Sequence, residues 1–128
     1  MEVTKKNLSN SKVVKITLGL ELNPDTQEVG GMVELDIENQ SKFVEAVNHC
    51  LDEGKANIIT DIQYVSYTDS SGLWSLFEGH KKASQKGGKL ILLNPTKDVK
   101  RILDITKMSS KIAILNNEQE AIAAFNEE

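Results

Sequence analysis

The chain has 128 residues, of which 39% are hydrophobic, enough for one domain with a single core and too apolar for a disordered segment. Its formal net charge is −4, with no block of basic residues and few aromatic side chains, so a nucleic-acid-binding surface is disfavoured and a protein partner fits better. No apolar run reaches the roughly 20 residues that cross a bilayer, and the first residues lack the apolar core of a secretion signal. We therefore expect a cytoplasmic protein without membrane contact, folded as one domain over residues 1–128.

The first part of the chain has the pattern of short strands and turns. Residues 2–6 are expected to form an edge strand, and residues 7–11 a turn. Residues 13–20 alternate between apolar and polar, as a half-buried strand does, and residues 31–36 are expected to pair with them. Asn-Pro-Asp and Gly-Gly sequences within residues 19–31 supply turn chemistry between the two strands.

A helix is expected over residues 39–53, because apolar side chains recur there at helical spacing and Gly54 then supplies a stop. Its inward face is predicted to consist of Phe43, Val47, Cys50 and Leu51. Cys50 is the only cysteine, which excludes an intrachain disulfide, and a small buried core residue is a simpler interpretation than a reactive thiol. The apolar run 57–61 then predicts a strand.

After a connector over residues 62–67, a second helix is expected to begin near Ser70, and its apolar face is predicted to hold Leu73, Leu76, Phe77, His80 and Ala83. Gly87 and Gly88 resemble a phosphate loop only superficially, because the first glycine and the magnesium-binding hydroxyl of that motif are missing. A glycine turn at the helix end, feeding a strand over residues 89–93, explains them better.

The last third alternates in the same way. A third helix is expected to bury Val99, Ile102, Leu103 and Thr106. A short strand over residues 111–114 follows, then a terminal helix capped by Asn116 or Asn117, with Ala121, Ile122 and Phe125 facing inward. Helices that alternate with apolar strands predict an α/β sandwich with a mixed, mostly parallel sheet, an N-terminal antiparallel hairpin and about four helices.

The most informative stretch is Asp69-Ser70-Ser71-Gly72-Leu73, where the strand pattern changes to the helical one. The first backbone N–H groups of a helix have no intrahelical partner and carry partial positive charge. Asp69 or Ser70 can cap these donors, and capping is the simpler interpretation from spacing alone. A phosphate on one of the serines would be attracted to the same groups, so a modification site is the alternative.

Residues 59–73 resemble the signature of STAS domains, specifically that of bacterial anti-sigma factor antagonists. The resemblance covers residues 33–125, because the strand 89–93, the helix that follows Pro95 and the strand 111–114 occur in the order typical of the family. It implies a STAS-type sandwich. It also implies that a partner kinase phosphorylates a serine of the Asp-Ser-Ser-Gly motif, Ser71 by family position, with Ser70 as the near alternative.

The resemblance implies roles for further residues of the motif. Asp69 would orient the turn, Gly72 would permit close approach, and Leu73 would anchor the helix. Trp74 departs from the small residue expected at this place in the family and puts the identity of the kinase in doubt. Weaker candidates for the docking surface are Asp36, Asp61, Lys100 and Arg101. For Asp36 and Asp61 the simpler interpretation is that they cap turns. For Lys100 and Arg101 it is that they lie on a solvated helix face.

The mechanism implied by the resemblance is partner switching. The unphosphorylated protein would bind an anti-sigma factor that is also a serine kinase. This binding would release a sigma factor, and phosphorylation would end it. ATP would belong to the kinase, and a metal-dependent phosphatase would remove the phosphate, so no cofactor or metal is expected in this chain. It would be no enzyme, since the sequence has neither a phosphate loop nor an acid/base cluster.

Two alternatives are open. The chain is also compatible with a non-switching STAS scaffold, a subunit of a larger signalling or transport-associated assembly. In addition, the Glu-Leu-Asp turn of the family matches either residues 33–36 or Leu20-Glu-Leu-Asn23. We prefer residues 33–36, because a helix of ordinary length then follows, and residues 19–31 then form a longer hairpin than the family usually has.

Overall fold

The computed structural model describes residues 1–10 and 12–125. Ser11 of the expected turn and residues 126–128 of the expected domain lie outside the described residues. The main sheet has five strands in the order β1-β2-β6-β8-β9. They are β1 (Glu2–Leu8), β2 (Val13–Gly19), β6 (Asn57–Asp61), β8 (Lys89–Leu93) and β9 (Ala113–Leu115).

The pairing directions in this sheet are those predicted. β1 and β2 form an antiparallel hairpin, whereas β2, β6, β8 and β9 pair in parallel. The edge strand is longer than predicted, because Asn7 and Leu8 belong to β1 and not to the turn. Ser9 and Asn10 make the described part of the turn with φ values of 51° and 58°, in the left-handed region that asparagine tolerates better than most residues.

The predicted pairing of residues 31–36 with residues 13–20 is wrong. β5 (Val33–Leu35) instead pairs in parallel with β7 (Val65–Thr68), because β2 has β1 on one edge and β6 on the other. The stretch that we expected to be a connector, residues 62–67, therefore contains most of a strand. β5 and β7 form a two-stranded ladder separate from the main sheet.

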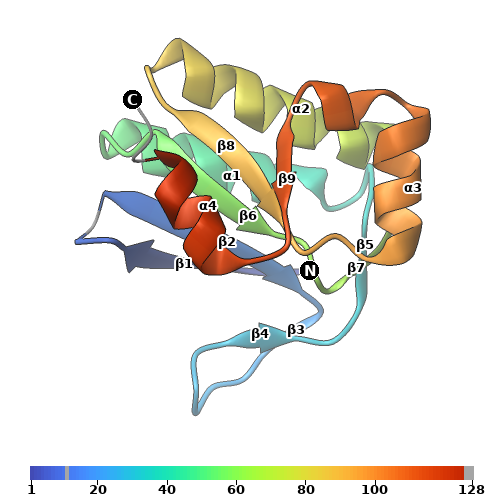
Figure 1. Ribbon diagram of the computed structural model, residues 1–128. Helices are drawn as coiled ribbons and strands as arrows, with labels where there is room; N and C mark the ends of the chain where they lie inside the picture. Colours follow the sequence, from blue (N-terminus) through green and yellow to red (C-terminus); the bar gives the residue numbers. More distant parts are fainter. Residues whose placement is uncertain (11, 126–128) are drawn as a thin grey trace.

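The segment 19–31 is a short hairpin of its own. Its strands are β3 (Glu21–Leu22) and β4 (Val29–Gly30), which pair antiparallel. Figure 1 shows this hairpin below the main sheet, on the side away from α1 and α2.

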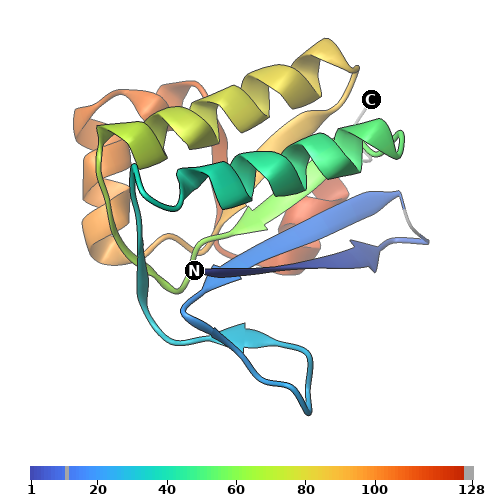
Figure 2. The same ribbon diagram turned by 180° about the vertical axis from the view of Figure 1, so that it is seen from behind.

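Within the part of the chain that the structure describes, four α-helices surround the sheet, in agreement with the prediction. α1 (Gln40–Asp52) and α2 (Ser70–Gln85) lie side by side over one face, and α4 (Glu118–Phe125) covers part of the other (Figures 1 and 2). α3 (Lys97–Ile105) packs beside β7 and is followed by a 3₁₀ turn, Met108–Ser110.

The strands are apolar on both sides because each face of the sheet has a core. Ile58 of β6 packs in the core beneath α1 and α2 with Phe43, whereas its neighbour Ile59 packs in the second core with Ala121 of α4. Leu90 and Ile91 of β8 divide in the same way. Parallel strands covered on both faces typically read as such continuous apolar runs.

Most helix ends have the predicted signals. Gly87 has a φ of 84° and donates its N–H to the Ser84 carbonyl, while Gly88 donates to the Ala83 carbonyl, which is a Schellman turn. Asn117 caps α4, accepting the N–H of Glu120 at 3.1 Å. Thr106 is the exception: it was expected to be buried, but it is exposed, because α3 ends at Ile105.

Candidate functional site

Asp69 links the first turn of α2 to the loop that precedes α1. One carboxylate oxygen, Oδ1, accepts the N–H of Gly72 at 2.8 Å, the geometry of a helix N-cap. The other, Oδ2, accepts the N–H of Ile37 at 3.1 Å. The single carboxylate therefore binds two segments that lie 32 residues apart in the sequence.

Gly72 lies where α2 meets the end of β5. A Cβ atom at this position would be 2.2 Å from the carbonyl oxygen of Leu35 and 2.3 Å from Oγ1 of Thr68. The Thr68 hydroxyl donates a hydrogen bond to the same Leu35 carbonyl, at 2.9 Å. The helix can approach the β5–β7 ladder this closely only because residue 72 has no side chain.

The two serines occupy the first two positions of α2. Ser70 is exposed and Ser71 is half-buried. Within residues 1–10 and 12–125, neither hydroxyl makes a hydrogen bond. Leu73, on the inward side, is buried in the core, so the helix start is fixed while the serines remain at the surface.

Two large apolar side chains are exposed beside the serines. Trp74 is 56% exposed and lies one turn after Ser70 and Ser71, on the same helix face. Ile37, whose N–H is bound by Asp69, is 70% exposed. Exposed aromatic and aliphatic side chains are typical of a protein-binding surface.

The structure does not bring every predicted docking residue to this surface. Asp36 is close to it but caps a turn, since its Oδ1 accepts the N–H groups of Glu38 and Asn39. Asp61 is 1% exposed and shares the α4 side of the sheet with Ile59. Among the described residues, its carboxylate accepts hydrogen bonds from the backbone and side-chain N–H groups of Gln63 and forms an ion pair with Lys15, 3.6 Å away.

Lys100 and Arg101 lie on the exposed side of α3. Lys100 pairs with Asp104 one turn later, at 2.8 Å, and this hydrogen bond lowers the pKa of the Asp104 carboxyl. The geometry agrees with a solvated helix face. Any docking role of these two bases stays a prediction.

Sequence reasoning missed Ile37 as a residue of this surface. The signal was present, since an isoleucine stands among turn-forming polar residues, between Asp36 and Glu38. What the sequence does not reveal is the hydrogen bond that places this turn beside the start of α2, because it joins segments distant in the chain.

The described residues contain no helix that is long and apolar enough to span a membrane. Nor does this part of the chain gather three or more metal-binding side chains at one place.

The family model of the STAS domain matches residues 30–121, so the chain belongs to the STAS domain family. Among solved structures, TM1081 from Thermotoga maritima superimposes with a TM-score of 0.78 at 23% identity, over 98% of this chain and 95% of that one. An anti-sigma factor antagonist from Mycobacterium paratuberculosis gives 0.74 at 13% identity, over 98% and 96%. The unphosphorylated anti-sigma factor antagonist SpoIIAA gives 0.70 at 20% identity, over 94% and 93%. At these identities the structural likeness establishes the fold alone.

Proposed function

We propose that this STAS domain is an anti-sigma factor antagonist that works by partner switching. In its unphosphorylated form it binds an anti-sigma factor that is also a serine kinase, and a sigma factor is released. The observation that carries the proposal is the Asp69-Ser70-Ser71-Gly72 turn, in which two surface hydroxyls at the start of α2 lie beside exposed Trp74.

Ser71 is the proposed phosphate acceptor, on the strength of its place in the family motif, and Ser70 is the alternative. Ser70 is the more exposed of the two, and both lie one helical turn before Trp74, so the surface around Trp74 is within reach of either serine. Both hydroxyls belong to the first turn, where the partial positive charge of the helix favours an added phosphate.

Phosphorylation is expected to change binding without unfolding the domain. A phosphoserine adds about −1.5 to −2 charges, which the helix N-terminus tolerates. At a packed interface the same charge brings a desolvation cost and repulsion from Asp69, whose carboxylate caps the turn. The partner would therefore dissociate from a domain that keeps its fold.

The chain is proposed to act as the kinase's substrate and not as an enzyme. The kinase brings its own ATP, and a metal-dependent phosphatase restores the hydroxyl. This cycle needs no cofactor in the chain, no nucleic acid and no membrane, and it places the protein in the cytoplasm.

Intact-mass measurement tests the modification. The purified chain is incubated with ATP and each anti-sigma factor kinase of its source organism, and the cognate kinase is expected to add one phosphate. Ser71→Ala should abolish the addition, whereas the matched control Ser70→Ala should keep it. Phosphate mapped to Ser70 alone would overturn the assignment to Ser71.

Affinity measurement with the same kinase tests the switch. Ser71→Asp is expected to weaken binding by tenfold or more, while Ser70→Ala should bind as the wild type does. Unchanged affinity of Ser71→Asp for every candidate kinase, with no phosphate transferred, would favour the non-switching scaffold.

A further inference from the structure

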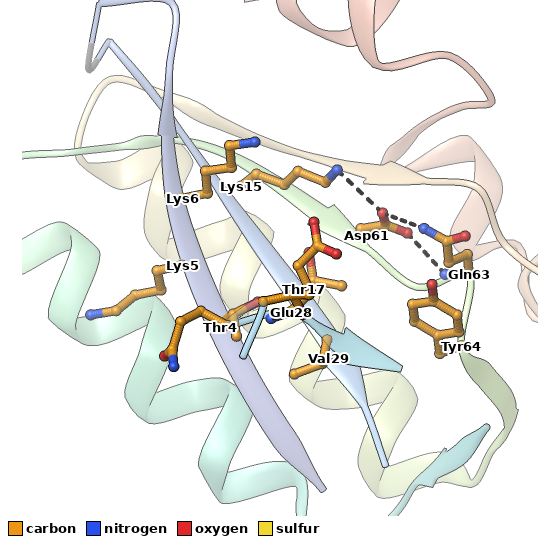
Figure 3. A pocket seen from close by; sticks show the side chains of 12 residues that line it. Thr4, Lys5, Lys6, Lys15, Thr17, Glu28, Val29, Asp61, Gln63 and Tyr64 are labelled. Carbon is orange, nitrogen blue, oxygen red and sulfur yellow. Dashed lines mark hydrogen bonds and ion pairs between the residues drawn. The ribbon is translucent and has the colours of Figure 1, made fainter. Parts of the chain in front are cut away.

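A pocket of about 430 Å³ lies on the α4 side of the main sheet, between the β1–β2 strands and the β3–β4 hairpin. Figure 3 shows it from close by, with Lys6 and Lys15 side by side, the Asp61 carboxylate next to the Lys15 ammonium, and Gln63 and Tyr64 beyond Asp61. It is separate from the Asp69–Ser71 turn, and none of the residues proposed for partner switching lines it except Asp61. A volume of this size is in the range of small-molecule sites.

One wall of the pocket is built by the β3–β4 hairpin and its loop, from Thr26 to Val29. Val29 of β4 is buried against β2, and a Cβ atom on Gly19 would lie 3.0 Å from the Cβ of Val29, so the hairpin is docked on the sheet. At the tip, Oδ1 of Asn23 accepts the N–H groups of Asp25 and Thr26, at 2.8 and 3.2 Å. These bonds fix the loop that carries Glu28 into the pocket.

Two lysines stand directly opposite each other across β1 and β2. Lys6 and Lys15 are register partners, and like charges in this arrangement repel each other. Lys15 is compensated, because its Nζ lies 2.7 Å from Oε1 of Glu118 and 3.6 Å from Asp61. Lys6 forms no ion pair with any acid in the described residues. Its ammonium is therefore a positive charge at the pocket that an anion would neutralise.

The neighbouring groups supply hydrogen bonds of both kinds. Thr4 and Thr17 are the next register pair on the same face and present hydroxyls beside the lysines. Toward the hairpin and the end of β6, Glu28 offers a hydrogen-bond acceptor, and Gln63 and Tyr64 each offer a donor and an acceptor. An ammonium at one end and acceptors at the other match a molecule that combines an anionic group with hydroxyls.

We propose that this pocket binds a small hydroxylated organic anion, such as a sugar phosphate or a hydroxycarboxylic acid. Lys6 holds the anionic group, and Glu28, Gln63 and Tyr64 bind the hydroxyls. The site goes beyond the proposed partner switch, since binding requires neither a kinase nor a modified serine.

Amide NMR of the full chain tests this, with glucose 6-phosphate and citrate as probes and with glucose and inorganic phosphate as controls. Saturable shifts at the amides of Lys6, Thr17, Glu28 and Tyr64 are expected with at least one probe. The probe that produces them shows whether the bound anionic group is a phosphate or a carboxylate. Glucose and inorganic phosphate should each bind at least tenfold more weakly. Absence of saturable shifts at millimolar probe, or equal binding of inorganic phosphate, would overturn the proposal.

Variants of Lys6 then test whether this residue binds the anionic group of the probe. Lys6→Met should weaken probe binding about tenfold, the loss of one charge-assisted hydrogen bond. Lys6→Arg should restore most of it, which separates a charge requirement from a folding defect. Lys81→Met, a matched exposed lysine on α2 across the sheet, should bind within twofold of the wild type. Undiminished binding by Lys6→Met would contradict the assignment.

Discussion

The Asp69 carboxylate accepts a hydrogen bond from the peptide N–H of Ile37 at 3.1 Å while it caps α2 through Gly72. The start of α2 and the turn before α1 are thus held by one side chain. The surface that we propose for partner binding depends on this bond, because it places exposed Ile37 next to the serine turn.

Replacing Asp69 should loosen both segments. Asp69→Ala removes the cap and the contact with Ile37, and we expect a loss of about 1–2 kcal/mol in the free energy of unfolding, measured with urea. Hydrogen exchange at the Gly72 and Ile37 amides should accelerate. Asp25→Ala, which removes an exposed carboxylate at the hairpin tip, should change the free energy by less than about 0.5 kcal/mol. Unchanged exchange at the Ile37 amide in Asp69→Ala would show that the bond contributes nothing.

Gly72→Ala should be among the most damaging single-methyl additions in the chain. Its Cβ would overlap the Leu35 carbonyl, a backbone atom that cannot move without shifting β5. We expect a loss of about 3 kcal/mol in the free energy of unfolding, the upper part of the range for overpacking. Gly30→Ala is the matched control, since nothing lies within 4 Å of that Cβ, and it should be nearly neutral. Equal stability of the two variants would contradict this account of α2 packing.

Trp74 should matter for binding and little for folding. Because its ring is mostly in solvent, Trp74→Ala is expected to change the free energy of unfolding by less than about 1 kcal/mol. If the kinase docks on this surface, the same change should weaken binding by tenfold or more, measured by calorimetry. Leu22→Ala, an exposed apolar residue on the β3–β4 hairpin, should leave kinase affinity unaltered. The opposite ranking of the two variants would move the docking surface to the hairpin.

The ion pairs of Lys15 should make the free energy of unfolding depend on pH in the alkaline range. Burial lowers the pKa of this lysine, but the hydrogen bond and charge of Glu118, together with Asp61, outweigh it, so the pKa lies above its ordinary value. The resulting stabilisation is fully present below the unfolded pKa of about 10.4 and is lost as pH rises through the folded pKa.

The measurement is urea unfolding at neutral pH and at a series of values above pH ~10. Lys15→Met should lower the free energy of unfolding at neutral pH by about 1–3 kcal/mol, because Asp61 loses its ion partner. The difference between wild type and variant should shrink as pH rises. Lys107→Met, an exposed lysine, should keep the pH dependence of the wild type. A difference that stays constant with pH would rule out the charge of Lys15 as its cause.

The elements that sequence patterns predicted well are those with a local signal. The helices carrying Phe43 and Leu76 have apolar faces at helical spacing, and the strand ending at Asp61 contains the adjacent isoleucines Ile58 and Ile59. Glycine positions also predicted helix ends, as at Gly87, because glycine adopts the positive φ of a helix C-terminal turn at little steric cost.

The pairing of β5 with β7 was not predictable in this way. Each strand has only three or four residues, and their register is set by how α1 and β6, which lie between them in the sequence, pack in the core. The position of Ile37 depends on a long-range contact too, the hydrogen bond to Asp69. Local patterns identified the Asp69–Ser71 turn, whereas the surface around it and the pocket required the tertiary structure.

The β5–β7 ladder has a consequence for how such a protein can diverge. Its outward side chains, among them Glu34 and the half-exposed Tyr67, touch neither of the two cores. Substitutions there alter the surface beside the serine turn while the main sheet is left intact. If a partner docks on the surface that we propose, a change of partner preference at Glu34 or Tyr67 therefore costs little folding free energy.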